Sequence, residues 1–149
     1  MLTATHSGFF SRRYEIRGTG GKAITLRIVG WRGAGHYNWK GDSFVARPEG
    51  FGGRFNLERR GKVVGYANKR LVTRRMDVFL DGDAFQLAAK HPFSRDFEFT
   101  QGARILGTIT SDVCFGRDLK AKLPDSLSMP QKIFLLWLVS WMHRQQRRT

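Results

Sequence analysis

The sequence has 149 residues, of which 41% are hydrophobic and 13% aromatic, and it contains a single cysteine. This length suits one domain with a substantial core, and the hydrophobic content excludes an intrinsically disordered chain. Lysine and arginine exceed aspartate and glutamate so far that the formal net charge is +14. Such an excess indicates a polyanionic partner, namely nucleic acid, an anionic lipid surface or an acidic protein. Codon bias toward arginine would give the same composition without any such partner.

The N-terminal segment and the lone cysteine bear on where the protein acts. The first residues, MLTATHSGFFSRRY, lack the basic and then apolar pattern of a signal peptide. Cys114 has no second cysteine to pair with and lies in an apolar segment, where we expect a small buried side chain. We therefore expect a cytoplasmic monomer that contacts the membrane, if at all, as a peripheral protein at the inner surface.

Strand-like segments separated by glycine or aspartate turns fill about residues 9–122. Residues 9–17 and 22–29 predict a first hairpin, in which Ile24, Leu26 and Ile28 alternate with polar residues. Three further hairpins and a last strand are predicted over residues 54–59 with 62–69, 76–80 with 84–90, 95–100 with 104–110, and 115–123. The middle hairpin turns on an Asp-Gly pair, the strongest short-range hairpin signal.

Two of these hairpins share a sequence pattern. The first contains Phe-x-Leu from position 55 and the second Phe-x-Phe from position 97, and Gly65 and Gly107 each follow ten residues after the first phenylalanine. Glycine inside a strand usually marks a β-bulge or a close backbone approach. The pattern predicts duplicated hairpins that close around a shared core.

A turn-rich linker over residues 123–129 leads to a predicted helix over about residues 130–146. Ser128 and Gln131 have the spacing of a capping box. Residues 133–142 are apolar except for Ser140, and a helix without a polar face must be enclosed on all sides. We therefore predict a mainly β fold, a closed antiparallel barrel around one hydrophobic C-terminal helix. The apolar run rises only about 15 Å, half of the ~30 Å hydrocarbon core, and is too short to span a membrane.

The hairpins of the form Phe-x-Leu…Gly and the segment LPDSLSMPQKIFLLWLVSWMHR resemble small bacterial members of the tubby-like C-terminal domain superfamily. That group includes the tubby proteins, the plant LURP-one-related proteins and the phospholipid scramblases. The resemblance implies one domain over residues 1–149, with about twelve strands threaded by the helix, and binding of anionic phospholipid through a basic surface. The cysteine cluster and calcium-binding segment of the scramblases are missing from the sequence, and no binding residue of the family can be carried over.

No catalytic or metal-binding motif stands out. The four histidines form neither an HxxxH nor an HExxH pair. The glycines before Lys22 fail the phosphate-loop spacing because Ile16 stands where its first glycine would be. We expect a non-enzymatic binding domain with no cofactor and no metal.

Basic clusters carry the remaining functional signal. Near an anionic membrane each such cation contributes about 1 kcal/mol, so that several converging on one place would hold a headgroup. The alternative is a solvated rim that keeps an aromatic-rich barrel soluble. The candidate residues for binding an anionic ligand are Arg12, Arg13, Lys69, Arg70, Arg74 and Arg75.

Residues 30–41 are predicted to form a loop that mixes aromatic and basic side chains. Trp31 and Trp39, near Arg32 and Lys40, are candidate interfacial aromatics. This mixture suits a membrane interface or stacking on single-stranded bases. Alternatively, both tryptophans pack at the mouth of the barrel. Phospholipid headgroups are the favoured ligand. There are two alternatives, a nucleic-acid-binding protein and a protein-interaction scaffold. Against nucleic acid, the sequence has no helix-turn-helix, RNP motif or zinc finger.

Overall fold

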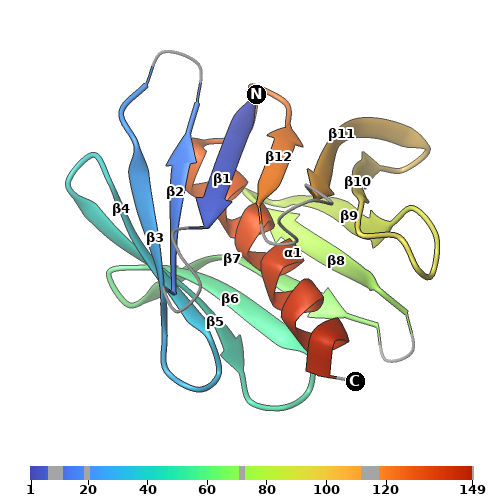
Figure 1. Ribbon diagram of the computed structural model, residues 1–149, viewed down its shortest axis with the longest axis horizontal. Coiled ribbons are helices and arrows are strands. Elements are labelled where there is room, and N and C mark those ends of the chain that lie inside the picture. Colours follow the sequence, from blue (N-terminus) through green and yellow to red (C-terminus); the bar gives the residue numbers. More distant parts are fainter. Residues whose placement is uncertain (7–11, 19–20, 71–72, 112–117, 149) are drawn as a thin grey trace.

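Twelve antiparallel strands close into a barrel around one C-terminal helix (Figure 1). The computed structural model describes residues 1–6, 12–18, 21–70, 73–111 and 118–148. The elements are β1 (Leu2–His6), β2 (Arg13–Arg17), β3 (Ile24–Val29), β4 (Ala34–Trp39), β5 (Asp42–Glu49), β6 (Arg54–Arg59), β7 (Lys62–Lys69), β8 (Arg75–Leu80), β9 (Asp83–Ala89), β10 (Phe97–Gln101), β11 (Arg104–Ser111), β12 (Leu119–Lys122) and α1 (Met129–Arg148). The predicted mainly β, closed barrel is confirmed.

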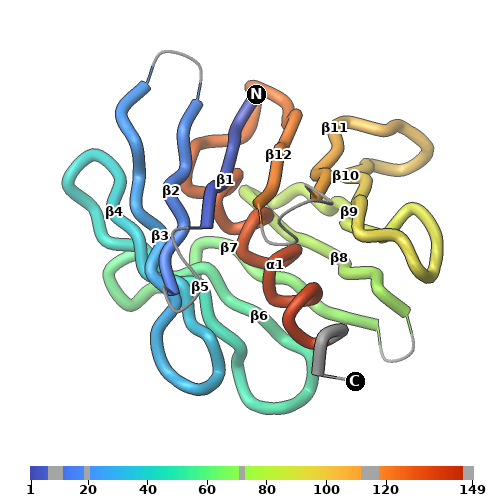
Figure 2. Tube along the Cα trace, viewed as in Figure 1, coloured from blue at the N-terminus to red at the C-terminus, as the bar shows by residue number. Residues whose placement is uncertain are grey.

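The chain runs as a meander in which each strand pairs with the next, and β1 closes the ring by pairing with both β2 and β12 (Figure 2). Because every connection reverses the chain, successive connections alternate between the two ends of the barrel. We call the end where α1 begins the N-end and the end where it finishes the C-end. The N-end carries the turns at residues 40–41, 60–61, 81–82 and 102–103, and the C-end the connections at residues 30–33, 50–53, 70–74 and 90–96.

The middle of α1 is fully enclosed. Seven consecutive side chains, from Ile133 to Val139, are each at most 1% exposed. Burying a large apolar side chain is worth about 1.5–3 kcal/mol, so this segment is a main source of stability. Within the described residues, no helix is long and apolar enough to cross a membrane.

The start of α1 is fixed by the predicted capping box, which is confirmed. The backbone N–H of Ser128 donates to Oε1 of Gln131 at 2.9 Å, and the backbone N–H of Gln131 donates to Oγ of Ser128 at 3.4 Å. The Gln131 amide nitrogen also donates to Oδ2 of Asp81 at 2.7 Å. The cap therefore ties the helix to the β8–β9 turn at the N-end.

Strand β4 and Gly33, the residue before it, hold the start and the middle of the helix. The indole N–H of Trp137 donates to the carbonyl of Gly33 at 2.9 Å, and the buried hydroxyl of Tyr37 donates to the carbonyl of Pro130 at 2.7 Å. Burial raises the pKa of Tyr37 well above its usual value, because the charged form would lose its hydration. Gly35 lies against Trp137 so closely that an added Cβ would be 2.6 Å from the indole Cδ1.

The two hairpins that share a sequence pattern, β6–β7 and β10–β11, have matching irregularities. The register shifts between Leu57 and Glu58 opposite Gly65, and between Phe99 and Thr100 opposite Gly107. A Cβ at Gly107 would overlap the carbonyl oxygen of Lys122. The predicted bulge and close backbone approach are therefore confirmed.

Three strands lie where the sequence analysis did not place them. β4 occupies the middle half of the segment 30–41, which was predicted to be a loop. Ala34, Gly35 and Asn38 have low β propensity, and the strand is stabilised by packing instead. β5 contains Pro48, which argues against a strand in sequence terms. β1 begins at Leu2, ahead of the predicted start at residue 9.

The remaining differences concern strand ends. The last predicted strand, over residues 115–123, is confirmed only as β12, which is shorter. Residues 9–11, 115–117 and Cys114 lie outside the described residues, and so does the central part of the first predicted turn.

Replacing Gly35 with alanine tests the docking of the helix on β4. The added methyl group meets a fully buried indole, so we expect Gly35→Ala to lower the free energy of unfolding by about 1–3 kcal/mol in urea denaturation followed by tryptophan fluorescence. Gly21→Ala is the control, since nothing lies within 4 Å of its added Cβ, and it should change stability by less than about 0.5 kcal/mol. Equal stability of the two variants would contradict this packing.

Candidate anion-binding site

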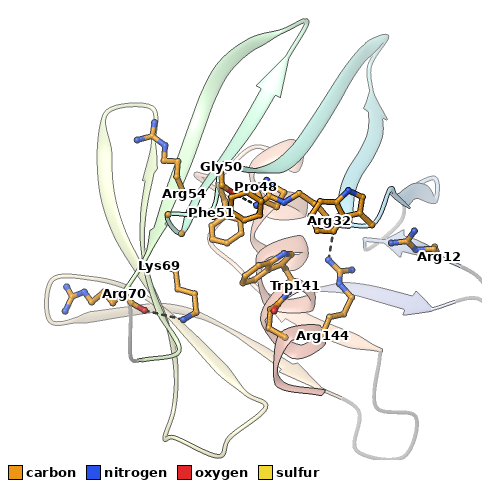
Figure 3. A pocket seen from close by; sticks show the side chains of 16 residues that line it. Arg12, Arg32, Pro48, Gly50, Phe51, Arg54, Lys69, Arg70, Trp141 and Arg144 are labelled. Carbon is orange, nitrogen blue, oxygen red and sulfur yellow. Dashed lines mark hydrogen bonds between the residues drawn. The ribbon is translucent and has the colours of Figure 1, made fainter. Parts of the chain in front are cut away.

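A basic pocket of about 470 Å³ opens at the C-end, between the β3–β4 and β5–β6 turns, the end of β7 and the end of α1 (Figure 3). Six of its lining residues are lysine or arginine, and none of the described lining residues is aspartate or glutamate. The basic residues are Arg12, Arg32, Arg54, Lys69, Arg70 and Arg144. We refer to this cavity as the basic pocket.

Two glycine-containing turns shape its rim. Gly30 and Gly33 in the first turn, and Gly50 and Gly53 in the second, all have positive φ angles, from 61° to 82°. The carbonyl of Gly53 accepts a hydrogen bond from the backbone N–H of Lys69 at 2.8 Å, which closes the second turn onto β7. Gly33, Gly50 and Gly53 line the pocket without a side chain of their own.

The helix supplies the floor. Trp141 lies between the surrounding cations in Figure 3 and packs edge to face on Phe55, with ring centroids 4.5 Å apart. One turn later, the guanidinium group of Arg144 lies 3.5 Å from the carbonyl oxygen of Gly33. The C-terminal turns of α1 therefore belong to the pocket, while its middle belongs to the core.

Three lining cations donate hydrogen bonds to neutral carbonyl groups. Arg12 donates to the carbonyl of Gly30 at 2.7 Å, and Arg32 donates to the carbonyl of Gly50. Lys69 donates to the carbonyls that flank the β7–β8 turn, at 3.3 and 3.2 Å. Within the described part of the chain none of these three forms an ion pair with a carboxylate, so their positive charge is not neutralised.

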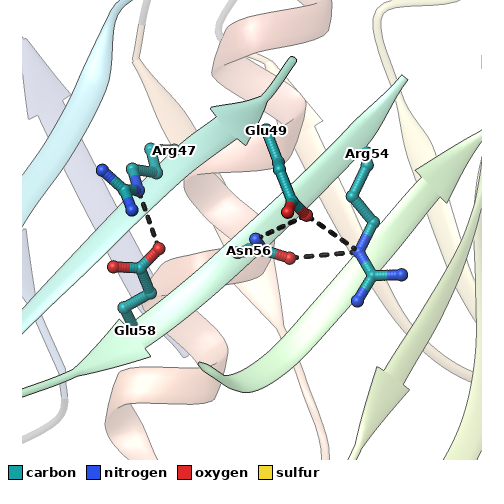
Figure 4. Close-up of polar contacts among 5 residues, drawn as sticks. All are labelled: Arg47, Glu49, Arg54, Asn56 and Glu58. Atoms are coloured by element: carbon teal, nitrogen blue, oxygen red, sulfur yellow. Dashed lines mark hydrogen bonds and ion pairs between the residues drawn. The ribbon is translucent and has the colours of Figure 1, made fainter. Parts of the chain in front are cut away.

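Two further lining cations, Arg54 and Arg70, point away from the pocket and pair with carboxylates. Nε of Arg54 lies 3.7 Å from the Glu49 carboxylate and donates to Asn56 at 3.1 Å, beside the Arg47–Glu58 pair on the outer wall (Figure 4). Arg70 pairs with Asp77 at 3.3 Å. In Figure 3 both guanidinium groups are directed outward, so they form the wall rather than the floor.

The structure brings together half of the basic residues chosen from the sequence. Arg12, Lys69 and Arg70 line the basic pocket. Arg13 on β2 and Arg75 on β8 are exposed and lie outside its lining. The predicted cluster is therefore split by the barrel wall.

Arg74 has a structural role, because it binds backbone carbonyls of the β9–β10 connection. Its guanidinium group donates to the carbonyls of Pro92, at 3.4 Å, and Ser94, and lies 5.1 Å from the ring centre of Phe97. Desolvation by burial, reinforced by the nearby charge of Arg95, lowers its pKa. Arg74 thus anchors the β9–β10 connection.

The two candidate tryptophans lie at opposite ends of the barrel. Trp31, on the β3–β4 turn, is 75% exposed at the rim of the basic pocket. Trp39, at the end of β4, is half-buried beside a second cavity at the N-end, where its packing partners belong to the core. The pair therefore does not share one surface.

Phe51 and Arg54 were not predicted as site residues, and Trp141 was expected only in the core. Phe51 is the single large side chain within Gly50-Phe-Gly-Gly53, and an aromatic residue in such a glycine-rich turn was a usable signal. Arg32 was noted only as a neighbour of Trp31, and Arg144 was not chosen as a candidate. Their convergence depends on closure of the barrel, which no local pattern reports.

Metal ligation and comparison with known proteins add no further constraint. Among the described residues, no three His, Cys, Asp or Glu side chains are grouped so as to hold a metal ion. No family model matches the chain, and neither a curated protein nor a solved structure matches it significantly. The geometry of the basic pocket alone defines the candidate site.

Inorganic pyrophosphate tests whether the pocket holds a compact polyanion. We expect millimolar pyrophosphate to raise the midpoint of thermal unfolding, because a ligand that binds only the folded state stabilises it. Lys69→Gln should remove most of this increase. Lys62→Gln, which removes the same charge at the other end of the same strand, should retain it. An equal loss in both variants would mean that net charge alone, rather than the pocket, binds the anion.

Proposed function

We propose that the protein is a non-enzymatic binding domain that engages anionic phospholipid headgroups in the basic pocket, as a peripheral protein on the cytoplasmic side of a membrane. One observation carries the proposal: a pocket of ligand size, about 470 Å³, has six basic residues in its lining and no acidic residue among those described. Two of these cations, Arg32 and Lys69, are half-buried and form no ion pair with a described carboxylate, which favours a ligand with concentrated negative charge.

The fold supports the proposed relationship to the tubby-like superfamily. A closed twelve-stranded barrel around a hydrophobic C-terminal helix is the architecture that this resemblance implies. Tubby domains bind phosphoinositide headgroups through basic side chains, which agrees with the ligand class proposed for the pocket. The pocket residues themselves are assigned from this structure and not from the family.

Nucleic acid is the second candidate ligand. Trp31 and Phe51 are exposed beside Arg32, and exposed aromatic rings next to cations suit stacking on unpaired bases. The concave shape and ligand-sized volume of the basic pocket favour a headgroup instead, because a single strand needs a groove that follows its backbone.

Vesicle sedimentation tests the proposed function. The protein should pellet with vesicles of phosphatidylcholine and phosphatidylglycerol, pellet little with phosphatidylcholine alone, and be released by salt. The double variant Arg32→Gln/Lys69→Gln should bind the anionic vesicles about 25-fold more weakly, at roughly fivefold for each cation.

The matched control is Lys62→Gln/Arg104→Gln, which removes two exposed charges at the N-end and should bind as the wild type does. Equal binding to neutral and anionic vesicles would overturn the proposal. So would a single-stranded oligonucleotide that competes the protein off the vesicles at concentrations far below those of the lipid.

A further inference from the structure

The exposed aromatic side chains gather at one end of the barrel. Among the described residues only three aromatic side chains are exposed, namely Phe51 at 87%, Phe93 at 87% and Trp31 at 75%. All three lie on connections of the C-end, the end that carries the basic pocket. The large apolar side chains exposed at the N-end, including Val63 and Ile105, are aliphatic. This uneven distribution indicates an interaction surface at the C-end.

Trp31 and Phe51 are held next to each other by a cation. The guanidinium carbon of Arg32 lies 4.6 Å from the ring centre of Phe51 and 5.8 Å from that of Trp31. The same guanidinium group donates to the carbonyl of Gly50, which joins the β3–β4 and β5–β6 turns. Two apolar rings with a cation between them, all on the rim of the basic pocket, therefore form one continuous surface.

We propose that Trp31 and Phe51 insert into the interfacial region of an anionic bilayer, so that the barrel docks with its C-end on the membrane while the basic pocket holds a headgroup. This inference rests on the proposed function, because the pocket cations supply the attraction to the surface. Aromatic rings settle at the level of the headgroups, where an adjacent arginine can contact phosphate. The charge of the pocket matches an anionic bilayer and selects it over a neutral apolar partner.

In the proposed orientation the C-end contacts the membrane and the N-end stays in solvent. Insertion at the rim leaves the N-end, with its tight turns and the start of α1, facing the cytoplasm. Ile105, which is 62% exposed at the N-end, then stays in water when the protein is bound. It provides a control of comparable exposure and apolar character.

Fluorescence quenching by vesicles that contain lipids brominated along their acyl chains tests insertion directly. Bound wild-type protein should lose part of its tryptophan emission. Trp31→Phe, which keeps an aromatic ring but removes the reporter, should still sediment with the vesicles and lose most of this quenching. The remaining tryptophans include the fully buried Trp137 and the pocket floor Trp141, which insertion of the rim does not bring to the acyl chains.

Vesicle binding by truncated variants completes the test. Trp31→Ser and Phe51→Ser should each weaken binding to phosphatidylcholine–phosphatidylglycerol vesicles about tenfold, since each loses most of one buried aromatic side chain, and Ile105→Ser should bind as the wild type does. Wild-type protein that sediments with anionic vesicles without any quenching would overturn the insertion and leave the headgroup proposal standing. Protein that fails to sediment would overturn the headgroup proposal as well. Shielding of Trp31 by a single-stranded oligonucleotide, but not by vesicles, would assign the rim to base stacking and overturn the insertion.

Discussion

A helix with no polar face needs a wall on every side, and the rest of the structure depends on meeting that need. Seven consecutive helix side chains are fully buried, which an open sheet would not achieve because it covers one face only. Closure relies on β1, which bridges β2 and β12. It also relies on Gly35, whose missing side chain leaves room for Trp137. The apolar helix and the closed barrel are therefore one solution to one burial problem.

The two ends of the barrel are built differently, and the difference explains where a ligand can bind. At the N-end, three turns consist of a residue with positive φ followed by glycine, starting at Lys40, Arg60 and Asp81. Such two-residue turns match the strand twist. The cavity at this end, beside Trp39, has an acidic residue, Asp125, in its lining, which makes it less suited to an anion than the basic pocket. At the C-end the connections are longer, and α1 emerges between them to provide Trp141 as a floor. The element that fills the core thus also completes the basic pocket.

Features with a local signal could be predicted from the sequence, and those that depend on closure could not. The helix, its cap at Ser128 and the bulges at Gly65 and Gly107 were predicted because their patterns are contained in short segments. Strand β4 was missed because Gly35 interrupts its alternation of apolar and polar residues. A glycine at this buried position is explained only by its contact with Trp137, which is distant in sequence. In the same way, Arg12 and Lys69 were chosen for their charge, but only closure of the barrel brings them to one pocket. Closure also places Arg74 against the β9–β10 connection, where it binds backbone carbonyls.

Mapping the contact surface of an anionic phospholipid on the folded chain tests the central claim most directly. We would titrate the ¹⁵N-labelled protein with short-chain phosphatidylglycerol below its micelle concentration and follow the backbone amide shifts. The basic pocket and its rim predict shifts confined to residues 30–33, 50–53, 69–70 and 141–145. Shifts centred on the N-end turns at residues 40–41, 60–61 and 81–82, or spread evenly over the barrel, would contradict the account.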